Sequence, residues 1–125
     1  MTSSQTIKLN IAFVDPQLDL GKRHQQASRL ILELKELDTI DNVGLGISDK
    51  SPPMSKSPSS YIAGLLTAEV NLSNAKSVLS FLSNRLSGKP IELEVEADGK
   101  RLKVEARSVK ELEQAIAAAQ NFISS

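Results

Sequence analysis

The chain has 125 residues, with fifteen lysines and arginines balanced by fifteen aspartates and glutamates, one histidine and no cysteine. The length favours a single domain over residues 1–125, and the lack of cysteine excludes thiol chemistry, thiolate metal sites and disulfide bonds. Nucleic-acid-binding proteins usually carry a basic surplus or stripe. Neither half of this chain has such a surplus, so composition argues against a nucleic-acid partner.

The first residues do not have the pattern of a targeting signal. Residues 1–15 lack a basic stretch followed by an apolar core and a small-residue cleavage site. The longest weakly polar run, residues 61–72, is shorter than the roughly 20 residues of a transmembrane helix. We therefore expect a cytoplasmic protein without a membrane partner.

Hydrophobic patterning in the first half predicts a strand, a helix and a second strand. Apolar residues alternate with polar or small ones over residues 7–13, which is the period of a half-buried strand. Between residues 22 and 37 they recur at spacings of three and four, as on one face of a helix. The apolar alternation from Val43 to Ile47 suggests a second strand, and its two glycines weaken that prediction or mark a bulge. Residues 48–60 contain six serines and three prolines without apolar periodicity, so we expect a flexible loop.

The middle of the chain predicts two helices. Residues 61–70 are ambiguous, and we expect them to be helical. A break follows at residues 71–74, where Ser73 is the expected N-cap of a second helix that runs to about Leu86. Gly88 followed by Pro90 is a helix stop signal.

A hairpin is expected in the last third. Asp98-Gly99 is a strong two-residue turn signal, and folding the chain there places apolar residues opposite one another on one face. On the other face acidic residues of 91–97 lie opposite residues of 100–106, mostly basic ones. These pairs are Glu96 with Arg101, Glu94 with Lys103, and the like-charged Glu92 with Glu105, beside which Arg107 lies in sequence.

A capping box, Ser108 to Glu111, opens the last helix, whose apolar stripe ends at Ile123. The order of elements is then strand, helix, strand, loop, helix pair, hairpin, helix. This order predicts an α+β fold: a two-layer sandwich with a roughly four-stranded sheet, a C-terminal β-hairpin and three to four covering helices.

Catalytic and metal-binding signatures are mostly absent, since no P-loop, nucleophile elbow or H-E-x-x-H helix occurs. His24 is the only imidazole, and Asp15 or Asp19 could orient it in a nucleophile system. Its place in the first turn of the expected helix, beside Lys22 and Arg23, favours a solvated surface residue.

Two acidic groups could suggest metal or carboxylate chemistry. Asp38, Asp41 and Asp49 do not have the spacing of a calcium loop. Two of the three glutamates of residues 92–96, Glu94 and Glu96, have basic partners opposite them, which favours a charge-paired sheet face. We therefore expect no catalytic residue, no metal and no cofactor.

Two features favour an interaction surface. Met54 lies in the Ser/Pro segment, and such segments are common recognition elements. Residues 61–86 hold more apolar residues than two short helices can turn onto a small sheet, so some are expected to stay exposed and to form a partner face or a homodimer through the helix pair. The candidate surface comprises Tyr61, Leu65, Leu66, Phe81 and Met54.

The C-terminal half resembles a known family. A leucine-rich region is followed by I-E-L-E-V-E-A-D-G-K-R-L-K-V and then by S-V-K-E-L-E-Q-A-I. This pattern resembles the effector-associated constant component family, small bacterial proteins or domains encoded in NTP-dependent conflict (defence) systems beside variable effectors such as peptidases. The resemblance covers roughly Tyr61 to Ile123, the helix at 22–37 and Pro52-Pro53; after that pair, MSKSPSS replaces the family's small-residue, glycine-rich stretch.

The sequence and the resemblance lead to three hypotheses about function. The resemblance implies a non-enzymatic adaptor that couples to or regulates an effector protein encoded nearby, and it brings no catalytic residues. The alternative is a ferredoxin-like regulatory domain that binds a small ligand in a cleft near the glycines of Val43 to Ile47. A third hypothesis is a hydrolase built on His24.

Overall fold

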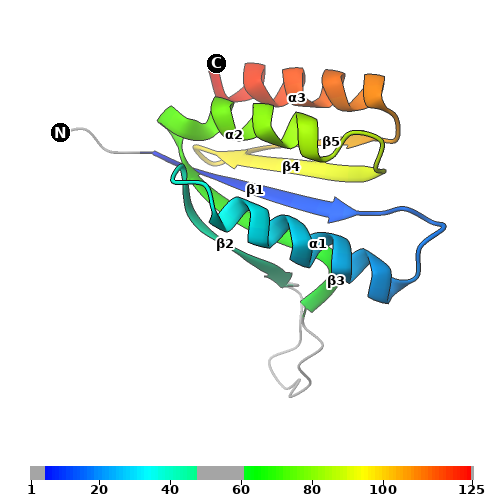
Figure 1. Cartoon of the computed structure of the whole chain (residues 1–125). Helices are drawn as coiled ribbons and strands as arrows, with labels where there is room; N and C mark the ends of the chain where they lie inside the picture. Colours follow the sequence, from blue (N-terminus) through cyan, green and yellow to red (C-terminus); the bar gives the residue numbers. More distant parts are fainter. Residues whose placement is uncertain (1–4, 48–60, 125) are drawn as a thin grey trace.

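The computed structural model describes residues 5–47 and 61–124 (Figure 1). The expected loop at 48–60, with Met54, lies outside the described residues. The elements of the described part are β1 (Thr6–Phe13), α1 (Leu20–Lys35), β2 (Ile40–Ile47), β3 (Tyr61–Asn71), α2 (Leu72–Arg85), β4 (Ile91–Ala97), β5 (Lys100–Ala106) and α3 (Val109–Ser124).

The strands form one open sheet of five strands in the order β2-β3-β1-β4-β5, and all neighbouring pairs are antiparallel. From β1 to β4 the chain follows β-α-β-β-α-β, and each helical crossover skips one strand, which is the split β-α-β connectivity. The α+β class is therefore confirmed, but the sheet has five strands where roughly four were expected. The finer description as a two-layer sandwich stays an interpretation.

The added strand comes from residues 61–70, for which the expected helix is wrong. These residues belong to β3, which lies between β2 and β1. Leu66 and Val70 are fully buried, whereas Leu65 and Thr67 are half-buried, so burial alternates with the period of a strand. The cap of α2 also differs: Asn71, and not Ser73, is the N-cap, and its Oδ1 accepts the Ser73 N–H at 3.0 Å. Since the helix pair does not form, a homodimer cannot use it.

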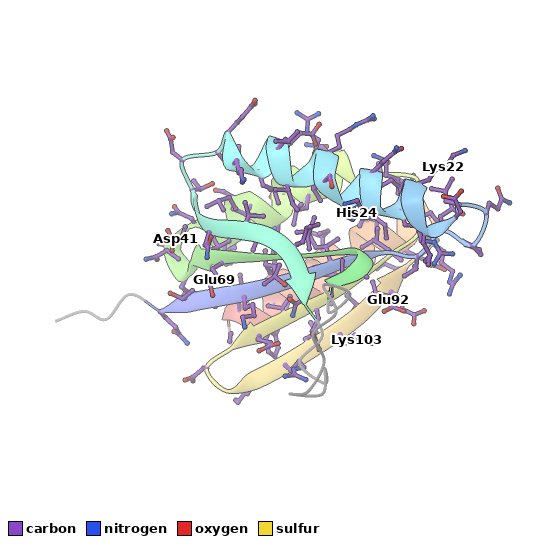
Figure 2. The ribbon with its side chains drawn as sticks, turned by 90° about the horizontal axis from the view of Figure 1, so that it is seen from below. Lys22, His24, Asp41, Glu69, Glu92 and Lys103 are labelled. Carbon is purple, nitrogen blue, oxygen red and sulfur yellow. The ribbon has the colours of Figure 1, made fainter. Side chains whose placement is uncertain are left out.

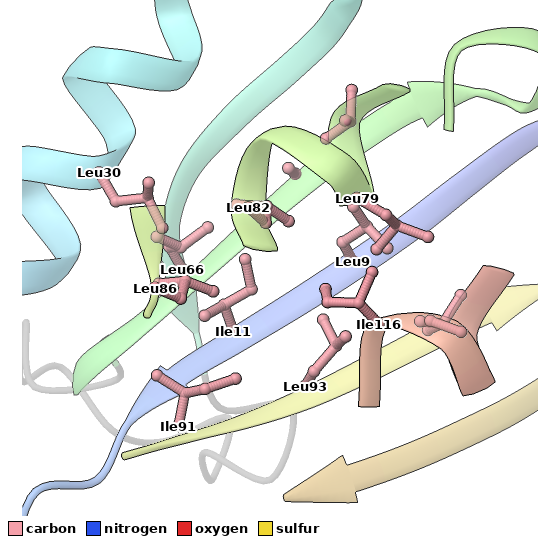
Figure 3. Packing of buried hydrophobic residues seen from close by; sticks show 14 of the residues in the cluster. Leu9, Ile11, Leu30, Leu66, Leu79, Leu82, Leu86, Ile91, Leu93 and Ile116 are labelled. Carbon is pink, nitrogen blue, oxygen red and sulfur yellow. The ribbon is translucent and has the colours of Figure 1, made fainter. Parts of the chain in front are cut away.

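The helices pack on one face of the sheet (Figure 1). α1 lies over β2 and β3, and α3 lies beside α2 over β5. Alternate residues of β1, from Ile7 to Phe13, are at most 2% exposed and meet the apolar stripes of the helices in a single cluster (Figure 3). Full burial of one such side chain stabilises the fold by about 1.5–3 kcal/mol. No helix in the described ranges is long and apolar enough to span a membrane.

The C-terminal hairpin agrees with its prediction. Asp98 and Gly99 both have positive φ, 55° and 76°, as a type I′ turn requires, and the strands pair in the expected register. One half of the expected capping box is present, because the Glu111 N–H donates to Ser108 Oγ at 3.1 Å, but the Glu111 side chain does not take the N-cap N–H that completes the box. Glu111 Oε1 accepts the Arg107 N–H at 2.8 Å, one residue before the N-cap.

Candidate functional site: the open face of the sheet

The face of the sheet that carries no helix contains a hollow of about 550 Å³. Because side chains alternate along a strand, the residues between the buried positions of β1, β3, β4 and β5 all point to this side. The lining, called the open face below, consists of Lys8, Asn10, Ala12, Leu45, Leu65, Thr67, Glu92, Glu94, Glu96, Arg101 and Lys103.

Strand register brings these residues together in rows across the sheet. The central row joins five strands, since Asn10 pairs with Thr67 on one side and with Glu94 on the other. Gly44 of β2 lies opposite Thr67, and Lys103 of β5 lies opposite Glu94. The row therefore changes from a bare glycine at one edge to a lysine at the other.

A continuous hydrogen-bond network follows this row. Thr67 Oγ1 donates to Asn10 Oδ1 at 2.7 Å, and Asn10 Nδ2 donates to Glu94 Oε1 at 3.0 Å and to Glu96 Oε2 at 3.4 Å. Arg101 then contacts both carboxylates, with Nε at 3.4 Å from Glu94 Oε2 and Nη2 at 3.5 Å from Glu96 Oε2. The Asn10 amide is held at both ends, by a donor and by acceptors, so its orientation is defined.

The ion pairs agree only in part with the expected cross-strand pairs. Arg101 contacts Glu96, as expected, but also takes Glu94, and Lys103 Nζ lies 3.7 Å from Glu92 Oε1 on the diagonal (Figure 2). The three glutamates are 24–32% exposed, whereas the two cations are 60–64% exposed. The basic groups therefore cover the carboxylates and present positive charge to solvent.

The like-charged pair in the hairpin is also compensated. Arg107 Nη2 lies 3.8 Å from Glu105 Oε1, while Glu92 has Lys103. Each glutamate of this cross-strand pair thus has its own cation.

The end of the open face near β2 is apolar, and the small residues there, Ala12, Gly44 and Gly46, leave space above the sheet. Leu65 lies opposite Ala12 in the register and leans over Gly46, where any side chain would overlap it. A side chain at Gly44 would have no atom within 4 Å. The β2–β3 register shifts between Leu45 and Ile47, but Gly46 there stands against residues 62–65, so the extra residues lie in β3 and a bulge at the glycines of β2 is not shown.

The structure does not gather the predicted partner surface in one place. Leu65 is on the open face, but Leu66 is 0% exposed in the core and offers no surface. Phe81 is half-buried against the core, with the Arg85 guanidinium 5.0 Å from its ring centroid. Tyr61 pairs with Ile47 at the start of β3, and Met54 lies outside the described residues.

The His24 arrangement does not resemble a nucleophile system. His24 is exposed on α1, with Nε2 at 3.5 Å from Ser28 Oγ (Figure 2). The two candidate orienting acids serve the backbone: Asp15 accepts the Gln17 N–H at 2.9 Å, and Asp19 caps α1 by accepting the Lys22 N–H at 2.8 Å.

The acidic residues considered for metal binding form no metal site among the described residues. Asp38, in the turn before β2, and Asp41, in β2, are both exposed, and Asp49 lies outside the described residues. In residues 5–47 and 61–124 no group of three or more potential ligands is arranged to hold a metal ion.

Chemically, the open face offers charged and hydrogen-bonding groups that are already engaged with one another. The Thr67 hydroxyl donates its proton to an amide oxygen, which is not a base, so the network does not activate it as a nucleophile. No signal within one sequence segment could have identified Asn10 and Thr67, because their contact depends on pairing between distant strands.

The chain matches no family model, no curated protein and no solved structure.

Proposed function

We propose that this protein is a non-enzymatic, cytoplasmic interaction module that couples to or regulates an effector protein in a bacterial NTP-dependent conflict system. The resemblance of the C-terminal half to the effector-associated constant component family supplies that setting. The observation that carries the proposal is the open face, a sheet surface with an ordered polar network and no covering helix.

The open face has the features that a protein partner can use. Arg101 and Lys103 are fixed by carboxylates yet remain more than half exposed, so they can contact acidic groups of a partner with little further ordering. Leu65, beside the small residues of β2, offers an apolar contact at the other end. A partner with an apolar anchor and acidic residues spaced across the sheet would complement both ends.

The test is binding of the purified protein to the effector encoded nearby. Arg101→Glu places a like charge beside Glu94 and Glu96 and reverses the exposed charge, so we expect affinity to fall about tenfold or more. Lys110→Glu, on exposed α3 away from the open face, is the matched control and should bind normally. Equal affinity of wild type and Arg101→Glu, with both folded by circular dichroism, would reject this surface.

A regulatory domain that binds a small ligand is the second candidate. The split β-α-β connectivity and the hollow of about 550 Å³, with Leu45 and Leu65 in its lining, favour it. Ala12→Leu would fill part of the hollow, because Ala12 is one of its lining residues. A metabolite that raises the melting temperature of the wild type but not of Ala12→Leu would support this candidate over the adaptor.

A homodimer remains a prediction, although the helix pair that was expected to form its interface is not present in the structure. Light scattering at micromolar concentration measures it directly: a dimer mass supports a homodimer, and a monomer mass rejects it.

A further inference from the structure

A second hollow lies on the helical side of the molecule, away from the open face. It has a volume of about 440 Å³ and is formed by one side of α1 and the end of α2, with Phe13 and Leu30 in its lining. This hollow is called the basic groove below. Its lining includes Gln26 and five charged residues, Lys22, Arg29, Glu33, Arg85 and Lys89.

Local structure explains why these residues converge. Lys22, Gln26, Arg29 and Glu33 follow one another at spacings of four, three and four, so they form one stripe along α1. On the other wall, Gly88 has φ +81° and turns the chain after α2. Lys89 therefore lies against the end of α2, with its N–H on Leu86 O at 3.0 Å and its Nζ donating to Arg85 O at 3.4 Å.

The groove carries uncompensated positive charge. Its lining contains four cations and one carboxylate, in a chain whose formal net charge is zero. The only ion pair between described lining residues joins Arg85 Nε and Glu33 Oε1 at 3.9 Å. Arg85 is also held by the Phe81 ring, so its guanidinium is positioned before any ligand arrives. Clustered cations of this kind attract an anion and repel one another without it.

Gln26 adds a second, independent observation. Its Oε1 is buried and accepts no hydrogen bond from any described residue. Buried polar atoms in native proteins nearly always have a partner. Because this oxygen is buried while Gln26 as a whole is only half-buried, a rotation of the Gln26 side chain would be needed for a hydroxyl or amino group of a ligand in the groove to provide the missing donor.

We propose that the basic groove binds a small organic phosphate with at least two negative charges and a hydroxyl or amino donor. Arg29 and Arg85 supply planar guanidinium groups suited to phosphate oxygens, and Lys22 and Lys89 add point charges. The volume of about 440 Å³ lies in the range of small-molecule sites. The site uses none of the open-face residues and does not depend on the adaptor function.

Calorimetric titration at low ionic strength tests the charge with inorganic pyrophosphate. Loss of one charge-assisted contact typically weakens binding by about tenfold or more, so we expect that loss in Arg29→Gln. Arg107→Gln is the matched control, because Arg107 pairs with Glu105 outside the groove, and it should bind as the wild type does. Lys22→Gln, at an exposed position, gives a second variant should Arg29→Gln not fold.

The Gln26 contact is tested with a nucleoside diphosphate. Gln26→Leu should weaken its binding several-fold and weaken pyrophosphate binding much less, because pyrophosphate lacks the sugar hydroxyls and the amino groups of the nucleoside. Unchanged binding of both ligands would reject that contact.

Three results would overturn the proposal. The first is that the wild type does not bind pyrophosphate, and the second is that Arg29→Gln and Arg107→Gln weaken binding equally. The third is that an oligo-aspartate peptide binds more tightly than pyrophosphate, which would assign the groove to acidic protein segments instead.

Discussion

The open face and the basic groove use the same residue types in opposite ways. On the open face, Arg101 and Lys103 lie 3.4–3.7 Å from glutamate oxygens. In the groove, four cations share one glutamate, whose ion pair with Arg85 is 3.9 Å long. Cross-strand register places most charges of the open face opposite or diagonal to a partner, whereas helical spacing can place like charges along one stripe. On the open face the positive and negative side chains therefore neutralise one another in a fixed pattern, whereas the basic groove concentrates positive charge.

The difference suggests different ligands. A neutralised, patterned surface discriminates between partners by geometry, because a mismatched charge on either side is penalised. A concentrated positive field selects for anionic charge first and for shape second. The proposed protein partner and the proposed phosphate ligand follow from this division.

The largest expected effect on stability tests which of two neighbouring leucines of β3 points into the core and which points to the open face. Leu66 and Leu65 are neighbours, but Leu66 is in the core and Leu65 is half-buried on the open face. Leu66→Ala should lower the free energy of unfolding by about 2–5 kcal/mol, and Leu65→Ala by less than about 1 kcal/mol. Urea denaturation measures both. Similar losses in the two variants would contradict the alternation of β3.

A smaller effect is expected at the two glycines of β2. Gly46→Ala must displace the Leu65 side chain, and we expect a loss of about 1–2 kcal/mol. Gly44→Ala meets open space and should change stability by less than about 0.5 kcal/mol. Equal stability of the two variants in urea would show that Leu65 does not lean over Gly46.

The smallest effects concern the charges themselves, and their signs should differ. Arg101→Gln leaves Glu94 and Glu96 without their cation, so we expect a loss of about 0.2–1 kcal/mol at low salt. Arg29→Gln relieves repulsion in the groove and should leave stability unchanged or raise it by a few tenths of a kcal/mol. Denaturation in low and high NaCl checks both, because screening should shrink each difference. Destabilisation of the same size in both variants would remove the contrast between the two surfaces.

The sequence predicted those features that depend on neighbouring residues. The register of the hairpin followed from Asp98-Gly99 and the alternation on either side, since the turn type determines which residues face one another. The cap at Ser108 and the stop at Gly88 are equally local.

Features set by distant contacts could not be predicted. β3 contains the doublet Leu65-Leu66, which blurs its two-residue period, and only pairing with β1 and β2 decides that it is a strand. Asn10 and Thr67 meet across 57 positions of sequence. The stripe of Lys22 and Arg29 is visible in the sequence, but the end of α2 that completes the groove is not.

The central claim is that the open face, and not the basic groove, contacts the effector. Affinity for the proposed effector, measured with wild type, Arg101→Glu and Arg29→Glu, tests this claim directly. The account predicts that Arg101→Glu weakens binding about tenfold or more, while Arg29→Glu binds like the wild type. Loss of binding in Arg29→Glu with full affinity in Arg101→Glu would contradict it.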